Sequence, residues 1–123
     1  MAKPITYLEL HTPDPAKAKA FYGQLFSWRF EDLQIPGMQY SMIKTGGELQ
    51  GGVRTPDGPR ASTLWLAYLT VEDLDATVAK ARSLGGSILK ERTEVANEGF
   101  FAVIADPTGA VFAIWQEAAR RKQ

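Results

Sequence analysis

The sequence predicts an α+β fold in which two tandem βαβββ modules form one curved, mostly antiparallel eight-stranded sheet, with the helices on its convex face. Two similar stretches indicate this fold. Residues 5–22 and residues 64–81 each read as a strand, a short acidic turn and an amphipathic helix. One offset of 59 residues places Tyr7 on Leu66 and Asp14 on Asp73. A fixed period is typical of a repeated structural unit, and each module alone is too small to cover its own sheet.

The first module is predicted over residues 4–55. Apolar and polar residues alternate over residues 5–11, which is typical of a strand. Asp14 suits the N-cap of a helix over residues 15–25, and Pro15 suits its first turn. Three further strands are predicted over residues 26–30, 39–44 and 48–54, the last containing Gly51 and Gly52. Glycines inside a strand often indicate a bulge or the close approach of another group.

A linker is predicted over residues 56–62, because prolines and a glycine interrupt the pattern there. The second module, over residues 63–116, repeats the first. Its predicted elements are a strand over 64–70, a helix over 71–84 and strands over 87–91, 99–105 and 110–115. Gly85 and Gly86 suit the helix end. A C-terminal tail over 117–123 follows, with a short helix predicted over 116–121.

The composition is that of an ordinary globular chain. The 123 residues include 14 basic and 14 acidic side chains, and the chain has no cysteine. A neutral chain lacks the basic surface that binding to a nucleic acid or an anionic membrane requires, so we expect neither as a partner. The absence of cysteine excludes disulfides and zinc–thiolate sites. No apolar signal segment is apparent near the start, and a cytoplasmic location is expected.

Several motifs resemble the vicinal oxygen chelate superfamily, which includes glyoxalase I, extradiol dioxygenases and the bleomycin resistance proteins. The resemblance is found at residues 14, 18–22 and 25–28 of the first module and at residues 71–74, 84–86 and 105–109 of the second. It implies a single glyoxalase-like domain over residues 1–123 and a homodimer. Lyase or dioxygenase activity is possible by this resemblance only.

The resemblance also implies where a metal would be bound. The chelating positions correspond to Tyr7, Leu66 and Ala113, with a fourth near residues 50–52. Leu66 and Ala113 have no donor atom, and a neutral tyrosine is a weak ligand. A catalytic metal needs about three protein ligands and an open position. We therefore expect no metal cofactor, with a divalent ion as the alternative.

Strand alternation predicts a ligand cleft on the face that the helices leave uncovered. The side chains expected to line this cleft are Tyr7, Glu9, His11, Gln50, Leu66, Tyr68 and Trp115. The predicted ligand is a small organic molecule, aromatic or cationic, that is bound without turnover, as in bleomycin resistance proteins. The predicted core includes Phe21, Tyr22, Trp28 and Phe30.

Glu9 and His11 are weak candidates for catalysis. They lie two residues apart on one strand face, where they can form an ion pair or act as a general base and its partner. A purely structural role is the simplest alternative, in which Glu9 pairs with Arg29 or Lys44. A glyoxalase- or dioxygenase-like enzyme with an unusual metal site of Glu9, His11 and Gln50 is another alternative. A non-catalytic interaction module is a third.

Overall fold

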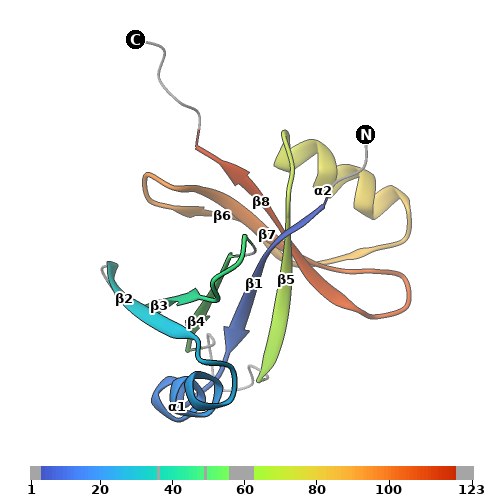
Figure 1. The fold of residues 1–123 in the computed structure, drawn as a ribbon. Coiled ribbons are helices and arrows are strands. Elements are labelled where there is room, and N and C mark those ends of the chain that lie inside the picture. The colour runs from blue at the N-terminus through green and yellow to red at the C-terminus, as the bar shows by residue number, and fades with distance from the viewer. Residues whose placement is uncertain (1–3, 36, 49, 56–62, 119–123) are drawn as a thin grey trace. The chain divides into compact units, whose positions relative to one another are not determined.

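The computed structural model describes residues 4–35, 37–48, 50–55 and 63–118 (Figure 1). The described residues form two compact units. The first unit covers residues 6–66, and the second covers residues 67–118 together with residues 4 and 5. The linker predicted over residues 56–62 lies outside the described residues. No helix in the described part of the chain is long and apolar enough to cross a membrane.

The order of the elements confirms the α+β class and the two βαβββ modules. The first module contains β1 (Ile5–His11), α1 (Pro15–Phe26), β2 (Arg29–Ile35), β3 (Met38–Lys44) and β4 (Gln50–Arg54). The second contains β5 (Leu64–Thr70), α2 (Leu74–Ser83), β6 (Ser87–Val95), β7 (Gly99–Ala105) and β8 (Val111–Glu117).

The strands of the first module follow the spatial order β2-β3-β4-β1. β4 pairs with β1 in parallel and with β3 antiparallel, and β2 and β3 are antiparallel. One face of these strands contributes Leu10, Ile43 and Val53 to a buried cluster, against which Ala18 and Tyr22 of α1 pack. Because side chains alternate along a strand, Glu9 and its neighbours Tyr7 and His11 lie on the face opposite α1.

Local side-chain chemistry sets both ends of α1. The Asp14 carboxylate accepts a hydrogen bond of 3.0 Å from the Lys17 amide, as an N-cap residue does. At the other end Ser27 adopts a left-handed conformation with φ of 61°, and its amide donates to the Gly23 carbonyl. The prediction of a strand over residues 26–30 is therefore wrong in its bounds. The helix continues to Phe26, and β2 begins only at Arg29.

The aromatic residues near α1 only partly follow the prediction that they belong to the core. Tyr22, Trp28 and Phe30 are half-buried and pack against the buried cluster, and the rings of Tyr22 and Trp28 stack at 5.6 Å. Phe21 is 59% exposed, so its assignment to the core is wrong. The helical period predicts one apolar side of α1. Phe21, however, lies beyond the edge of the surface by which α1 packs against the strands.

The strands of the second module follow the spatial order β5-β8-β7-β6, with β5 and β8 parallel. α2 buries Leu74 and Val78 against Ala102, Ile104 and Ile114. Asp73 accepts a hydrogen bond of 3.0 Å from the Ala76 amide. The helix accordingly begins at Leu74, three residues later than predicted, because the side chain that caps it is that of Asp73.

Two strands of the second module are longer than the sequence pattern indicated. β6 continues to Val95 rather than ending at Glu91, and its pairing with β7 shifts register on the way. The helix predicted over residues 116–121 is wrong where it can be checked. Gln116 and Glu117 extend β8 and pair with Phe100 and Gly99, and residues 119–121 lie outside the described part of the chain.

Candidate functional site

Strand register brings a polar cluster together on the face of the first unit opposite α1. In the parallel pair of β1 and β4, Glu9 lies beside Gly52 and His11 beside Arg54. In the antiparallel pair of β3 and β4, Tyr40 lies beside Arg54 and Met42 beside Gly52. Residues paired across a ladder project to the same side, so these side chains share one surface.

Glu9 is the centre of this cluster. Its side chain is buried, since the residue is only 5% exposed. One carboxylate oxygen, Oε2, accepts a hydrogen bond of 2.7 Å from the Tyr40 hydroxyl. The other, Oε1, lies 2.7 Å from Nε2 of His11. The pairing with His11 that the sequence suggested is therefore present. Lys44, the alternative partner, instead contacts Glu31 at 3.3 Å.

Two phenols extend the cluster beyond Glu9. The Tyr7 hydroxyl forms a hydrogen bond with the Tyr40 hydroxyl and lies 3.5 Å from the sulfur of Met42. Burial raises the pKa of Tyr7 to about 12; the hydrogen bond between the two phenols opposes this shift, and the charge of Glu9 adds to it. Burial and then the charge of Glu9 raise the pKa of Tyr40 far above its ordinary range. Both phenols therefore remain protonated at neutral pH.

Gly52 makes the contact between Tyr40 and Glu9 possible. Tyr40 belongs to β3 and Glu9 to β1, and β4 lies between these strands. A Cβ atom on Gly52 would lie 2.1 Å from the Tyr40 hydroxyl oxygen. The phenol thus reaches across β4 through the space that a side chain would fill. Tyr40 was not among the predicted site residues. The two adjacent strand glycines were the only sequence signal of this close approach.

The residues at the chelating positions do not fit a divalent metal. Tyr7 keeps its proton, Leu66 and Ala113 are buried and have no donor atom, and the Tyr40 phenol occupies the space beside Gly52. The alternative site of Glu9, His11 and Gln50 lacks a clear third ligand, because Gln50 lies beside Tyr7 and is exposed. Among the described residues no three His, Asp or Glu side chains gather closely enough to hold an ion.

The other predicted site residues fall in different units. Leu66 is a buried residue of the first unit. Tyr68 and Trp115 belong to the second unit. The Tyr68 ring lies 6.5 Å from that of Phe101, and Trp115 packs over the backbone of Gly99. Structure therefore gathers Tyr7, Glu9 and His11 into one cluster, and the role of Tyr68 and Trp115 in ligand binding stays a prediction.

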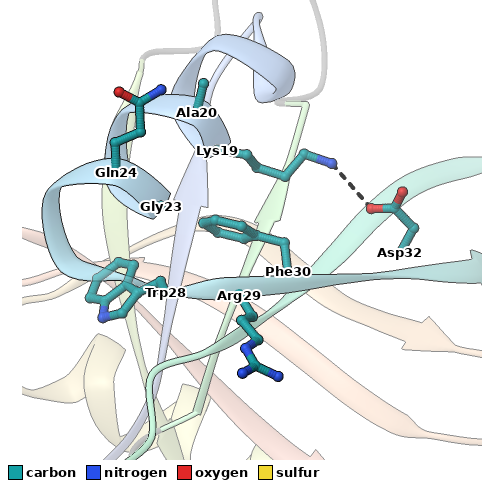
Figure 2. A pocket seen from close by; sticks show the side chains of 8 residues that line it. All are labelled: Lys19, Ala20, Gly23, Gln24, Trp28, Arg29, Phe30 and Asp32. Atoms are coloured by element: carbon teal, nitrogen blue, oxygen red, sulfur yellow. Dashed lines mark hydrogen bonds and ion pairs between the residues drawn. The ribbon is translucent and has the colours of Figure 1, made fainter.

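A hollow of about 640 Å³ lies between α1 and β2 of the first unit (Figure 2). Beside it, the Lys19 ammonium lies 3.1 Å from the Asp32 carboxylate and 3.2 Å from the Ser41 hydroxyl. Ser41 also donates to Asp32. The hydrogen bond from Ser41, and then Lys19, lower the pKa of Asp32. Figure 2 shows Arg29 pointing away from this pair. The three side chains connect α1 to β2 and β3, a connection that the sequence pattern did not reveal.

Comparison with known proteins agrees with this architecture. The model of the glyoxalase-like domain family matches residues 7–115. CFP32 of Mycobacterium tuberculosis (strain CDC 1551 / Oshkosh), which bears a provisional glyoxylase name, is 36% identical over 111 residues, covering 89% of this chain and 42% of the relative. The anthracycline biosynthesis protein DnrV of Streptomyces peucetius is 29% identical over 126 residues, covering 90% and 46%. The chain thus spans less than half the length of these relatives.

Solved structures with little sequence identity share the fold. Methylmalonyl-CoA epimerase from Mycobacterium tuberculosis matches with a TM-score of 0.67 and 16% identity, covering 94% of this chain and 88% of that one. The hypothetical protein BH1468 from Bacillus halodurans C-125 matches with a TM-score of 0.75 and 11% identity over the whole of both chains. At such identities these matches concern the fold alone. The family match over residues 7–115 and the 36% identity to CFP32 show that the chain belongs to the glyoxalase-like domain family of the vicinal oxygen chelate superfamily.

Proposed function

We propose that this domain binds a small, flat organic molecule, aromatic or cationic, without a catalytic metal. The ligand would contact the face that carries Tyr7, Glu9 and His11. The observation that supports this best is the Glu9 carboxylate, which is buried and held by Tyr40 and His11. A carboxylate fixed in a partly dry environment attracts a cation or a hydrogen-bond donor more strongly than one in water. The neighbouring phenol ring and methionine sulfur suit a flat apolar surface.

The side chains at the chelating positions support binding without a metal. A divalent ion needs deprotonated or neutral lone-pair donors around it. Tyr7 is held protonated, and Leu66 and Ala113 supply carbon atoms only. The polar groups that remain are already engaged with one another, which suits a preformed surface for recognition. Sequestration of a ligand without turnover, as in bleomycin resistance proteins, is the corresponding activity.

The name of one relative supports the ligand class. DnrV is named for anthracycline biosynthesis. An anthracycline is a flat, fused-ring molecule with an amino sugar, so it combines an aromatic surface with a cation. Both features complement a carboxylate beside aromatic side chains. We use this class as the first probe of the site.

The test is a titration of the chain with daunorubicin, an anthracycline, followed by the quenching of its fluorescence. We expect saturable binding with one ligand per chain. Glu9→Gln should weaken it about tenfold or more, because a lost charged contact costs about 1.5–3 kcal/mol and 1.4 kcal/mol is a factor of ten. Glu91→Gln is the matched control, since Glu91 is exposed and paired with Arg82 in the second unit. Equal affinity of wild type and Glu9→Gln would refute the assignment.

A parallel titration with Ni²⁺, Mn²⁺ and Zn²⁺ tests the metal-free part. Tight stoichiometric binding that Glu9→Gln or His11→Ala abolishes would favour the glyoxalase- or dioxygenase-like alternative. We also propose that the chain forms a homodimer, which the molar mass from light scattering would reveal. A mass of one chain at all concentrations would contradict it.

A further inference from the structure

We propose that the hollow between α1 and β2 binds an uncharged, flat heterocycle through a lactam edge, in which a ring C=O lies next to a ring N–H. The hollow has a volume of about 640 Å³, which is within the range of small-molecule sites. It lies on the side of the first unit that carries α1, whereas the polar cluster around Glu9 lies on the opposite face. It is therefore a second site, independent of the proposed function.

Aromatic rings form the floor of the hollow. Trp28 and Phe30 are half-buried and pack against the core of the first unit. Figure 2 shows the Phe30 ring between Trp28 at one end and the pair of Lys19 and Asp32 at the other. Phe30 and Asp32 are two residues apart on β2, so their side chains project to the same side with Cα atoms about 6.6 Å apart. A molecule of two fused rings that stacks on Phe30 can therefore reach Asp32 with its edge.

Gly23 leaves this floor open. It lies inside α1 and is not among the glycines with a left-handed backbone. A Cβ atom at Gly23 would lie 3.4 Å from the carbonyl oxygen of Trp28 and 3.6 Å from Cε2 of Phe30, which are ordinary contacts. The packing of α1 would thus accept alanine, which is the more stable residue inside a helix. A Cβ atom would, however, cover part of the Phe30 ring, so the glycine keeps that ring accessible.

Lys19 and Asp32 each have a hydrogen-bonding group to spare. The Lys19 ammonium has three hydrogens, and two of them go to Oδ1 of Asp32 at 3.1 Å and to the Ser41 hydroxyl at 3.2 Å. Ser41 donates to the same oxygen, Oδ1. Within the part of the chain that the structure describes, Oδ2 of Asp32 has no partner, and the Asp32 side chain is 73% exposed. A spare donor thus lies beside a spare acceptor.

The charges of this edge compensate each other, which favours an uncharged ligand. The hydrogen bond from Ser41, and then Lys19, lower the pKa of Asp32, so this carboxylate is ionised at neutral pH. An anionic ligand would meet Asp32, and a cationic ligand would meet Lys19. A lactam edge has one acceptor and one donor side by side. Its carbonyl can accept from Lys19 while its N–H donates to Oδ2 of Asp32, and both bonds involve a charged group, which makes them strong.

The test uses 2-quinolone, a flat lactam of two fused rings, and measures its binding by calorimetry. Asp32→Asn should weaken this binding about tenfold or more, the effect of one hydrogen bond to a charged group. 1-Methyl-2-quinolone has no N–H, so it should bind the wild type more weakly by a similar factor and should not respond to Asp32→Asn. Glu31→Gln is the matched control, because Glu31 is the neighbour of Asp32 on β2 and contacts Lys44 instead. It should change neither affinity.

Gly23→Ala provides a second, independent measurement. It should weaken the binding of 2-quinolone about tenfold, as a misplaced methyl group does in a packed contact, and at the same time raise the urea midpoint of unfolding. A purely structural glycine would not combine these two changes. Circular dichroism of each variant confirms that the chain is folded.

Four outcomes would overturn this inference. They are no binding of 2-quinolone, equal weakening of both probes by Asp32→Asn, unchanged affinity in Gly23→Ala, and loss of binding in Glu9→Gln. The last outcome would place the probe on the polar cluster. None of them decides the proposed function, which the daunorubicin titration tests separately.

Discussion

Substitution of Gly52 by alanine tests the central contact of the site. A Cβ atom there would lie 2.1 Å from the hydroxyl oxygen of Tyr40 and 2.4 and 2.6 Å from two carbons of its ring. Such distances cannot be tolerated, so the ring must move. Once it moves, Tyr40 no longer reaches Glu9, and a buried carboxylate loses one of its donors.

The magnitude follows from three contributions. Loss of a hydrogen bond to a charged group costs about 1.5–3 kcal/mol, and overpacking costs about 1–3 kcal/mol. Replacing glycine in a strand recovers about 0.5–1 kcal/mol through the unfolded chain. We therefore expect Gly52→Ala to lower the free energy of unfolding by about 2–5 kcal/mol.

Urea unfolding followed by tryptophan fluorescence measures this effect, because Trp28 and Trp65 both belong to the first unit. The decisive comparison is a double-mutant cycle with Tyr40→Ala. Tyr40→Ala is itself destabilising, but in that background Gly52→Ala should cost less than about 0.5 kcal/mol, an ordinary value for a substitution without a clash. If Gly52→Ala costs as much without Tyr40 as with it, the steric explanation is refuted.

Gly51→Ala is the matched control for this cycle. A Cβ atom at Gly51 would meet the backbone oxygen of Leu8 at 2.6 Å, and no side-chain truncation can relieve a clash with backbone. Gly51→Ala should therefore destabilise the chain to the same extent with and without Tyr40→Ala. Rescue of Gly51→Ala by Tyr40→Ala would show that the cycle reports a general softening of the first unit.

Three further predictions concern other ionisable groups. The pKa of Tyr7 is raised to about 12 from 10.0, so the contribution of the protonated phenol to stability is complete below pH 10.0 and is lost as the pH rises through about 12. Tyr7→Phe should therefore remove an ionisation near pH 12 from a titration followed by tyrosinate absorbance. Lys19→Met should speed amide hydrogen exchange in α1 without changing that of α2, because Lys19 connects α1 to Asp32 and Ser41. The pKa of Asp32 is lowered chiefly by the hydrogen bond from Ser41, so its contribution to stability is present above the ordinary carboxyl range and should be lost as the pH falls below that range. Asp32→Asn should flatten the acidic part of a profile of urea midpoint against pH.

The sequence was sufficient for features that depend on neighbouring residues. The start of α1 follows from Asp14, whose side chain caps the amide three residues ahead. Asp73 caps α2 in the same way, but the predicted helix began three residues too early, at Val71. The alternation of β1 likewise placed Tyr7, Glu9 and His11 on one face.

What the sequence could not supply is the register between distant strands. Tyr40 reaches Glu9 only because β4 lies between their strands with Gly52 at the crossing point. No local pattern specifies that alignment. The exposure of Phe21 was missed for a related reason, since a helical stripe shows which residues are apolar but not how far the partner surface extends.

The parallel pairing of the first and last strands in each module bears on how the chain is synthesised. β1 leaves the ribosome early, but its partner β4 follows only after α1, β2 and β3. The β2–β3 hairpin needs only local contacts and can form first. The backbone groups of β1 that pair with β4 therefore stay unpaired until Arg54 has left the ribosome. The backbone groups of β5 that pair with β8 stay unpaired in the same way until β8 has been made. The Glu9 cluster, which spans β1, β3 and β4, is thus assembled only as the first module completes its emergence.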